Sequence, residues 1–381
     1  MKYCKNCVMP DTRPNQVFDD ERVCDACRSH EQKILHVDWD TRKKEFDELI
    51  EKYRSKDGSN YDCIVPVSGG KDSTYQAWFM KEVYGLKVLC VSFEPTLPTE
   101  IGKQNLKNLQ DIGIDLIHFR KDPETYRKLE LKALKMVGDN DWPNHVGIFT
   151  VPVRVAVNYK IPLIVWGENP EEEYGGPAAE KAMKTKGRRR LEEFEMLGLR
   201  VHDMVGDGIK LQDLLPYIYP SDEEIKEAGV IGTYLGYYFK WDVPKQIKIV
   251  EEKCNWKPKP GEPMEGTFTN YEDIDCDGMV VHEYLKYVKY GFGRGTDHAC
   301  NKIREGLMSR EEAVGLVNKH DGKFPKNAMK RLLPYLGITK EEFFKIVKPF
   351  TNKEIFERDE TGEFKRDEDE NLIKKEDCIL K

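Results

Sequence analysis

The sequence lacks any long apolar run. None of its stretches approaches the roughly 18 consecutive apolar residues of a membrane-spanning helix, and the opening MKYCKNCVMP has no apolar core of the kind found in secretory signals. We therefore expect a cytoplasmic protein with no membrane partner. The 381 residues are enough for roughly two or three domains with cores of their own.

The chain also lacks an excess of positive charge. Lys and Arg total 61 against 68 Asp and Glu, which gives a formal net charge of -7. A surface that is negative overall argues against nucleic acid as a partner. The basic run KAMKTKGRRR at 181–190 leaves two interpretations open, a solvated helix face, which we favour, and a local patch for phosphate or a partner.

The ten cysteines do not have the distribution of a disulfide framework. Four of them form two CxxC pairs near the start of the chain, sixteen residues apart, at Cys4, Cys7, Cys24 and Cys27. Two such pairs supply four thiolates to one zinc ion and leave no coordination position open, so we expect a structural Zn²⁺. An iron–sulfur cluster fits the same ligands and remains an alternative, as do four free thiols.

Short apolar runs alternate with helical patterns between residues 61 and 167. The runs at 61–67, 86–93, 114–119 and 161–167 are predicted strands, and helices are predicted at 72–85, 99–113, 123–138 and 145–159. This alternation predicts an α/β fold with a parallel sheet covered by helices on both faces, whose ligands bind beyond the carboxyl ends of the strands.

The turn SGGKDS, residues 68–73, directly follows the first predicted strand. Gly69 and Gly70 allow a tight bend in which backbone N–H groups converge on an anion. Ser68 and Ser73 add hydroxyl donors, and Asp72 can cap the next helix or hold Mg²⁺. The spacing is not that of the GxxxxGK[ST] loop, and a plain strand-to-helix turn is the alternative.

This hexad resembles the PP-loop of the ATP pyrophosphatases, whose fold is of the adenine nucleotide α-hydrolase-like type. Enzymes of this superfamily split ATP between its α and β phosphates and leave AMP on an oxygen of the substrate. The resemblance implies that Asp72 and Ser73 are catalytic and that three residues ending the second strand border the adenosine. The implied ATP and pyrophosphate ligands are Ser68, Gly69, Gly70, Lys71, Asp72, Ser73, Ser92, Phe93 and Glu94.

Over most of its length the chain resembles the N-acetyl sugar amidotransferases of surface-polysaccharide biosynthesis. The resemblance is carried, in order, by YCKNCVMPDTRP, CDAC, SGGKDS, WGENPEEEYGG, DGMVVHEYLKYVKYGFGRGTDHA and LMSREEAVGLVNKHDG. It implies an enzyme for lipopolysaccharide O-antigen or another surface glycan. Such an enzyme adenylates the acetamido group of a UDP-linked N-acetyl sugar and adds ammonia to give an acetamidino group, AMP and pyrophosphate.

The ammonia is expected to come from a partner glutaminase. A glutaminase needs a cysteine nucleophile at the mature amino terminus or on an elbow between a strand and a helix. Position 2 is Lys2, whereas Cys63 and Cys90 lie inside predicted strands. The chain is therefore predicted to be a synthetase subunit that receives ammonia from another protein or uses free ammonia.

Further candidates follow the fourth strand and a glycine-rich stretch near residue 300. Glu168 and Asn169 are candidate catalytic contacts to substrate or ammonia, and Tyr174 is a candidate substrate contact, although a solvated loop is the alternative. The stretch GFGRGTDHACNKIREG contributes Arg294, Asp297, His298 and Arg304 as a candidate grip on the sugar nucleotide. A capped turn between helices is the alternative there.

The predicted organisation has four parts. They are a zinc-binding segment with a linker helix at 1–55, an ATP pyrophosphatase domain at 56–205, a helical substrate or partner domain at 206–350, and a charged C-terminal tail at 351–381. Two other functions remain open. One is a zinc-containing PP-loop tRNA sulfur transferase, and the other is a zinc-stabilised adapter that only senses ATP.

Overall fold

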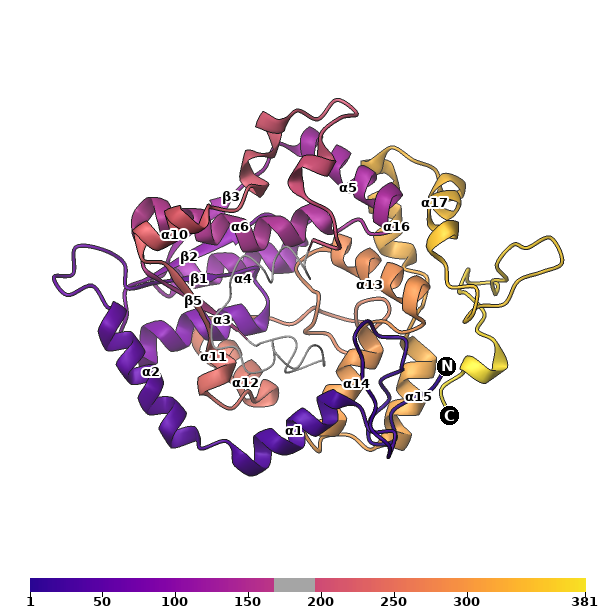
Figure 1. Cartoon of the computed structure of the whole chain (residues 1–381), viewed down its shortest axis with the longest axis horizontal. Helices are drawn as coiled ribbons and strands as arrows, with labels where there is room; N and C mark the ends of the chain where they lie inside the picture. The colour runs from indigo at the N-terminus through magenta and orange to yellow at the C-terminus, as the bar shows by residue number, and fades with distance from the viewer. Residues whose placement is uncertain (168–195) are drawn as a thin grey trace.

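A five-stranded parallel sheet lies at the centre of the protein. The computed structural model describes residues 1–167 and 196–381, and the sheet has the order β3-β2-β1-β4-β5 with all neighbouring pairs parallel (Figure 1). The strands are β1 Cys63–Pro66, β2 Val88–Phe93, β3 Asp115–Phe119, β4 Leu163–Trp166 and β5 Ile231–Tyr234. The predicted α/β class with a parallel sheet is confirmed.

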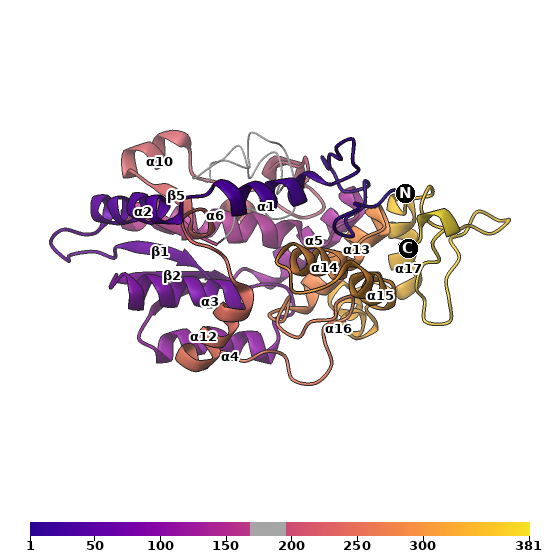
Figure 2. The ribbon, with the colours of Figure 1, turned by 90° about the horizontal axis from the view of Figure 1, so that it is seen from below.

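Helices cover both faces of this sheet (Figure 2). They are α3 Lys71–Trp78, α4 Glu100–Asp111, α5 Pro123–Val137 and α6 Trp142–Tyr159. Ile64 of β1 packs in one cluster with residues of α5 and α6, whereas its neighbours Cys63 and Val65 pack in another with residues of α3 and α4. Successive side chains of a strand point to opposite faces, so a strand buried on both faces is a continuous apolar run.

The fifth strand lies in the part of the chain that was predicted to be helical. β5 pairs with β4 from Leu163↔Ile231 to Trp166↔Tyr234. It is four residues long and runs directly into the short helix α11, Leu235–Tyr238. A strand this short, with Gly232 in the middle, gives too little period-2 alternation to be recognised.

The remaining helices precede β1, lie between β4 and β5, or follow β5 along the chain. They are α1 Asp25–His36, α2 Trp39–Tyr53, α10 Asp222–Ala228, α12 Val243–Cys254, α13 Asp277–Tyr290, α14 Arg294–Arg304, α15 Arg310–His320, α16 Lys326–Leu336 and α17 Lys340–Val347. A capping box opens α10, where Ser221 and Glu224 each accept a hydrogen bond from the backbone N–H of the other. Within residues 1–167 and 196–381, no helix combines the length and apolar content needed to cross a membrane.

The two ends of the chain lie side by side (Figures 1 and 2). Tyr3 donates a hydrogen bond of 2.8 Å to the Cys378 carbonyl. Arg310 donates through Nε to the Cys7 carbonyl and through Nη1 to the Lys381 carbonyl, each at 3.2 Å. Despite its high charge, the segment 351–381 also contributes to the core that contains α13, α16 and α17. Its buried members are Ile355, Phe356, Leu372 and Cys378.

Candidate functional site

The SGGKDS turn carries β1 into α3 at the carboxyl edge of the sheet. Gly69 has φ +95°, and a Cβ atom at this position would lie 2.6 Å from the Gly102 carbonyl oxygen. The indole Nε1 of Trp256 donates to the Gly69 carbonyl oxygen at 3.0 Å. Both the backbone conformation and the close approach of α4 therefore require glycine here.

The polar groups of the turn hold one another in place. Ser68 N–H donates to Ser73 Oγ, and Gly70 N–H donates to Ser68 Oγ, each at 3.3 Å. Gly70 is the N-cap residue of α3 and makes no side-chain cap. The first backbone N–H groups of α3 therefore have no side-chain acceptor from the N-cap residue, and they lie at the positive end of the helix dipole. A helix start of this kind can bind an anion.

Lys71 ties the turn to a distant part of the chain. Its ammonium is almost completely buried and lies 2.6 Å from carboxylate oxygens of both Asp72 and Glu272. Burial alone would lower the pKa of Lys71, but the two carboxylates outweigh it and raise that pKa. In this structure Lys71 therefore forms ion pairs with Asp72 of the turn and with Glu272.

A cavity of about 310 Å³ adjoins the turn on the side of β2 and β3, and it is lined by Ser68, Glu94, Gly102, His118 and Asp275 among others. The carboxylate of Glu94 lies 3.2 Å from Arg120 Nε. Of the three residues predicted to border adenosine, Glu94 lines this cavity. Ser92 and Phe93 are buried in β2.

Two titratable groups at this edge have altered pKa values because they are buried. Burial raises the pKa of Asp275 to about 6, and burial lowers the pKa of Lys121 to about 8. Lys121 Nζ donates to the Pro95 carbonyl at 2.8 Å, which places the ammonium just beyond the end of β2. These groups can change protonation near neutral pH.

A buried polar cluster at the start of α6 was not predicted from the sequence. Asp139 Oδ1 lies 2.9 Å from His282 Nδ1, and Asp141 Oδ2 lies 3.2 Å from His145 Nδ1. Burial lowers the pKa of His282, but Asp139 outweighs that effect and raises it to about 9. Asp141 adds to the raised pKa of Asp275, so its charge acts on the cavity beside the turn.

The candidate substrate residues occupy two different places. Arg294 Nη2 donates to Glu272 Oε2 at 2.9 Å, and His298 Nε2 lies 3.8 Å from the same oxygen. Asp297 pairs instead with Lys286 at 2.7 Å. Arg294 and His298 thus reach the turn through Glu272, which was not among the predicted residues.

Arg304 lies elsewhere, where α14 approaches the cysteines and a second cavity. Burial lowers its pKa, and the thiols of Cys300 and Cys7 raise it by more. The other candidates, Glu168, Asn169 and Tyr174, and the basic run at 181–190, lie outside the described residues.

The two CxxC pairs come together as one candidate metal centre. The sulfur atoms of Cys4, Cys7, Cys24 and Cys27 lie within 4.8 Å of one another and are buried. Cys7 Sγ and Cys24 Sγ are 3.6 Å apart, which suits a tetrahedral ion with Zn–S bonds of about 2.3 Å. The Cys24 amide donates to Cys4 Sγ at 3.2 Å. These four residues can therefore hold a metal ion such as zinc.

Fold and site together define an α/β protein with a glycine-containing turn between β1 and α3 and a tetracysteine segment. Residues 265–368 match a family model described as the C-terminal domain of LPS biosynthesis proteins like WbpG, which indicates a role in polysaccharide biosynthesis. The chain is also 25% identical over 291 residues to MJ1599, an uncharacterized protein of Methanocaldococcus jannaschii. That alignment covers 76% of this chain and 83% of the relative.

The matched segment contacts the SGGKDS turn through the ion pair between Glu272 and Lys71. It includes Glu272, Arg294 and His298. The matched segment and the SGGKDS turn therefore share one ion-pair network.

Proposed function

We propose that the protein is the synthetase subunit of an ATP-dependent N-acetyl sugar amidotransferase with a PP-loop. The observation that carries the proposal is the pair Lys71–Glu272, which joins the SGGKDS turn to a domain of LPS-biosynthesis type. That domain favours a nucleotide-linked sugar as the acceptor over the tRNA of thiolation enzymes.

The reaction requires activation of a poor electrophile. The acetamide oxygen attacks the α phosphate of ATP, the bond to the β phosphate breaks, and pyrophosphate leaves. Ammonia then adds to the activated carbon, a proton is lost and AMP departs, which leaves an amidine.

The roles of the protein groups follow from their positions. The amides that open α3 would receive the β and γ phosphates, and the cavity beside Glu94 would receive the adenosine. Asp72, about 40% exposed at the start of the helix, would hold Mg²⁺, which neutralises charge on the departing pyrophosphate.

The source of ammonia in this proposal is a separate glutaminase or free ammonium. All ten cysteines of the chain are buried. A glutaminase nucleophile has to be accessible to glutamine and activated by a neighbouring base. This burial supports a partner as the ammonia source.

The test is an incubation of the purified chain with ATP, Mg²⁺, ammonium and a panel of UDP-linked acetamido sugars. We expect AMP together with a sugar product about one mass unit lighter, since an oxygen is replaced by NH. Asp72→Asn should lower the rate of AMP formation by at least about 100-fold. Glu82→Gln, at an exposed position in the π-helical segment Phe79–Val83 that continues α3, is the matched control and should keep the rate. ADP in place of AMP would reject the mechanism.

A further inference from the structure

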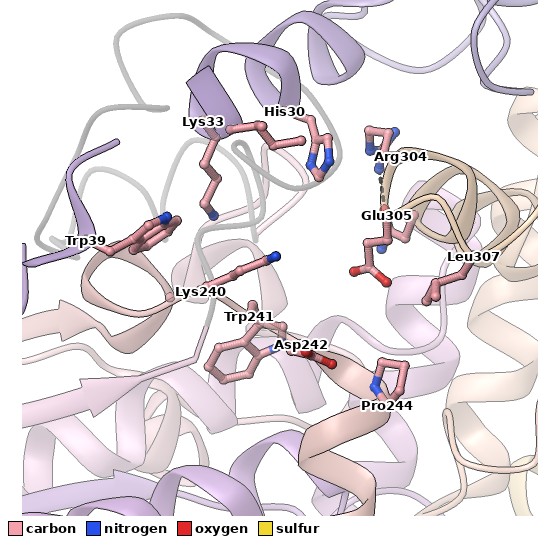
Figure 3. A pocket seen from close by; sticks show the side chains of 13 residues that line it. His30, Lys33, Trp39, Lys240, Trp241, Asp242, Pro244, Arg304, Glu305 and Leu307 are labelled. Atoms are coloured by element: carbon pink, nitrogen blue, oxygen red, sulfur yellow. Dashed lines mark hydrogen bonds between the residues drawn. The ribbon is translucent and has the colours of Figure 1, made fainter. Parts of the chain in front are cut away.

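A second cavity, of about 410 Å³, lies between α1, the segment that follows β5 and the end of α14 (Figure 3). Its lining includes His30, Lys33, Trp39, Lys240, Trp241 and Arg304. The volume is within the range of about 300–1,000 Å³ typical of small-molecule sites.

This cavity lies at the carboxyl edge of the sheet, as the SGGKDS turn does. Gly236, two residues beyond the end of β5, is part of its wall. Trp241 lies 3.8 Å from the position that a Cβ of Gly167, just beyond β4, would occupy. The ring of Trp241 also packs edge-on against Tyr75 of α3, with centroids 5.9 Å apart.

The strand order places the turn between the two cavities. The 310 Å³ cavity lies at β2 and β3, the turn follows β1, and the 410 Å³ cavity is lined by the segment that follows β5. An acceptor held in the second cavity would therefore approach the α phosphate from the side opposite the adenosine.

The lining combines cations with aromatic rings. In Figure 3 the side chains of Lys33 and Lys240 extend toward the same open space from different elements. Burial lowers the pKa of His30, and the charges of Arg304, Lys33 and Lys240 lower it further, as expected where positive charges converge.

The wall also carries two acidic residues, Asp242 and Glu305. Asp242 is the N-cap residue of α12, and its carboxylate accepts the Lys245 amide at 3.1 Å. The converging cations are suited to phosphate oxygens. The rings of Trp39 and Trp241 offer flat apolar surface to a base or a sugar.

We propose that this cavity binds the acceptor as a nucleoside diphosphate sugar, with Lys33, Lys240 and Arg304 contacting the diphosphate and a tryptophan packing against the base. The inference rests on the proposed function, because it takes the acceptor to be a UDP-linked sugar. It assigns the binding of that acceptor to α1 and to the segment after β5.

Titration of the full chain with UDP, without ATP, tests the inference by calorimetry and tryptophan fluorescence. Lys240→Ala should weaken UDP binding about tenfold, the equivalent of one charge-assisted contact. Trp39→Ala should weaken it similarly, while Trp39→Phe keeps a ring and should bind nearly normally. Lys245→Ala, an exposed lysine on α12 outside the lining, is the matched control. MgATP affinity should be unchanged in all four variants.

The outcomes separate the inference from the proposed function. UDP binding that is about tenfold weaker in Lys240→Ala and Trp39→Ala than in the wild type supports the inference even if no AMP is formed. AMP formation with a KM for the nucleotide sugar that is the same in these variants as in the wild type overturns the inference and leaves the proposed function standing. Failure of UDP to bind the wild type, or displacement of MgATP by UDP, also overturns it.

Discussion

Lys71 Nζ and Glu272 Oε1 lie 2.6 Å apart, so the first turn of α3 is held by a carboxylate from the domain of LPS-biosynthesis type. Glu272 also accepts from Arg294. Removal of the Glu272 carboxylate would leave Lys71 and Arg294 without this partner in a buried environment. Breaking a buried pair on one side is costly for this reason.

Glu272→Gln is therefore expected to lower the free energy of unfolding by on the order of 3–5 kcal/mol. Urea denaturation measures the effect. Glu262→Gln, at an exposed position in the same region, should change stability by less than about 0.5 kcal/mol. Equal stability of the two variants would show that the network does not support the turn.

Gly69→Ala is expected to cost about 2–5 kcal/mol of stability, since a left-handed backbone and a contact with the Gly102 carbonyl act together. Gly58 has φ +67° with nothing within 4 Å of an added Cβ. Gly58→Ala should therefore cost only the backbone strain, about 1 kcal/mol. Thermal or urea unfolding measures both, and MgATP binding should be lost only in Gly69→Ala. Similar effects of the two substitutions would contradict the close approach of α4.

The contribution of His282 to the stability of the protein should fall as the pH rises from about 6.5 to about 9. The pKa of His282 is raised from its ordinary 6.5 to about 9 in the folded protein, with burial opposing and Asp139 dominating. The folded state holds this proton more tightly than the unfolded chain does. The stabilisation is therefore fully present below about pH 6.5 and is lost as the pH rises through about 9.

The measurement is the free energy of unfolding from urea titrations between pH 6 and pH 10. His282→Gln should flatten the fall, while His36→Gln, exposed at the end of α1, should leave it unchanged. A slope that persists unchanged in His282→Gln would assign the effect to another group.

Removal of metal is expected to affect the two cavities differently. Cys24 is the N-cap residue of α1, and α1 contributes Lys33 to the 410 Å³ cavity. Chelation or Cys24→Ser should therefore abolish UDP binding, lower the thermal midpoint, and leave MgATP binding nearly intact. Metal analysis should find one zinc ion per chain in the wild type and in the exposed control Asp20→Asn. A chelated protein that still binds UDP normally would contradict this coupling.

Local features of the site were predictable because they depend on neighbouring residues. The SGGKDS turn follows from two glycines after an apolar run, and the cysteine cluster follows from the spacing within each pair. The four strands β1 to β4 were predicted for the same reason, since each is a buried run between turn residues.

The long-range partners were not predictable in this way. Glu272 lies in a stretch, TNYEDIDCDG, where several acids are equivalent by pattern, and the fold alone selects it for Lys71. Arg294 and Arg304 are the first and last residues of α14. Arg294 therefore contacts Glu272, whereas Arg304 lines the 410 Å³ cavity.

The polar run GDNDWPNH, residues 138–145, spans the start of α6. Asp139 and Asp141 precede an apolar helix. Acids in that position are often simple caps. Asp141 pairs with His145, four residues later on α6, whereas the pairing of Asp139 with His282 depends on where α6 meets α13.

Arg310 contacts the backbone of the metal segment and that of the last residue with a single guanidinium. A fluorophore placed near residue 381 should therefore act as a reporter of events at the cysteines, changing its signal when the ion is withdrawn. Affinity tags fused at that end would interfere with the same contact, which makes their cleavage advisable before metal stoichiometry is determined.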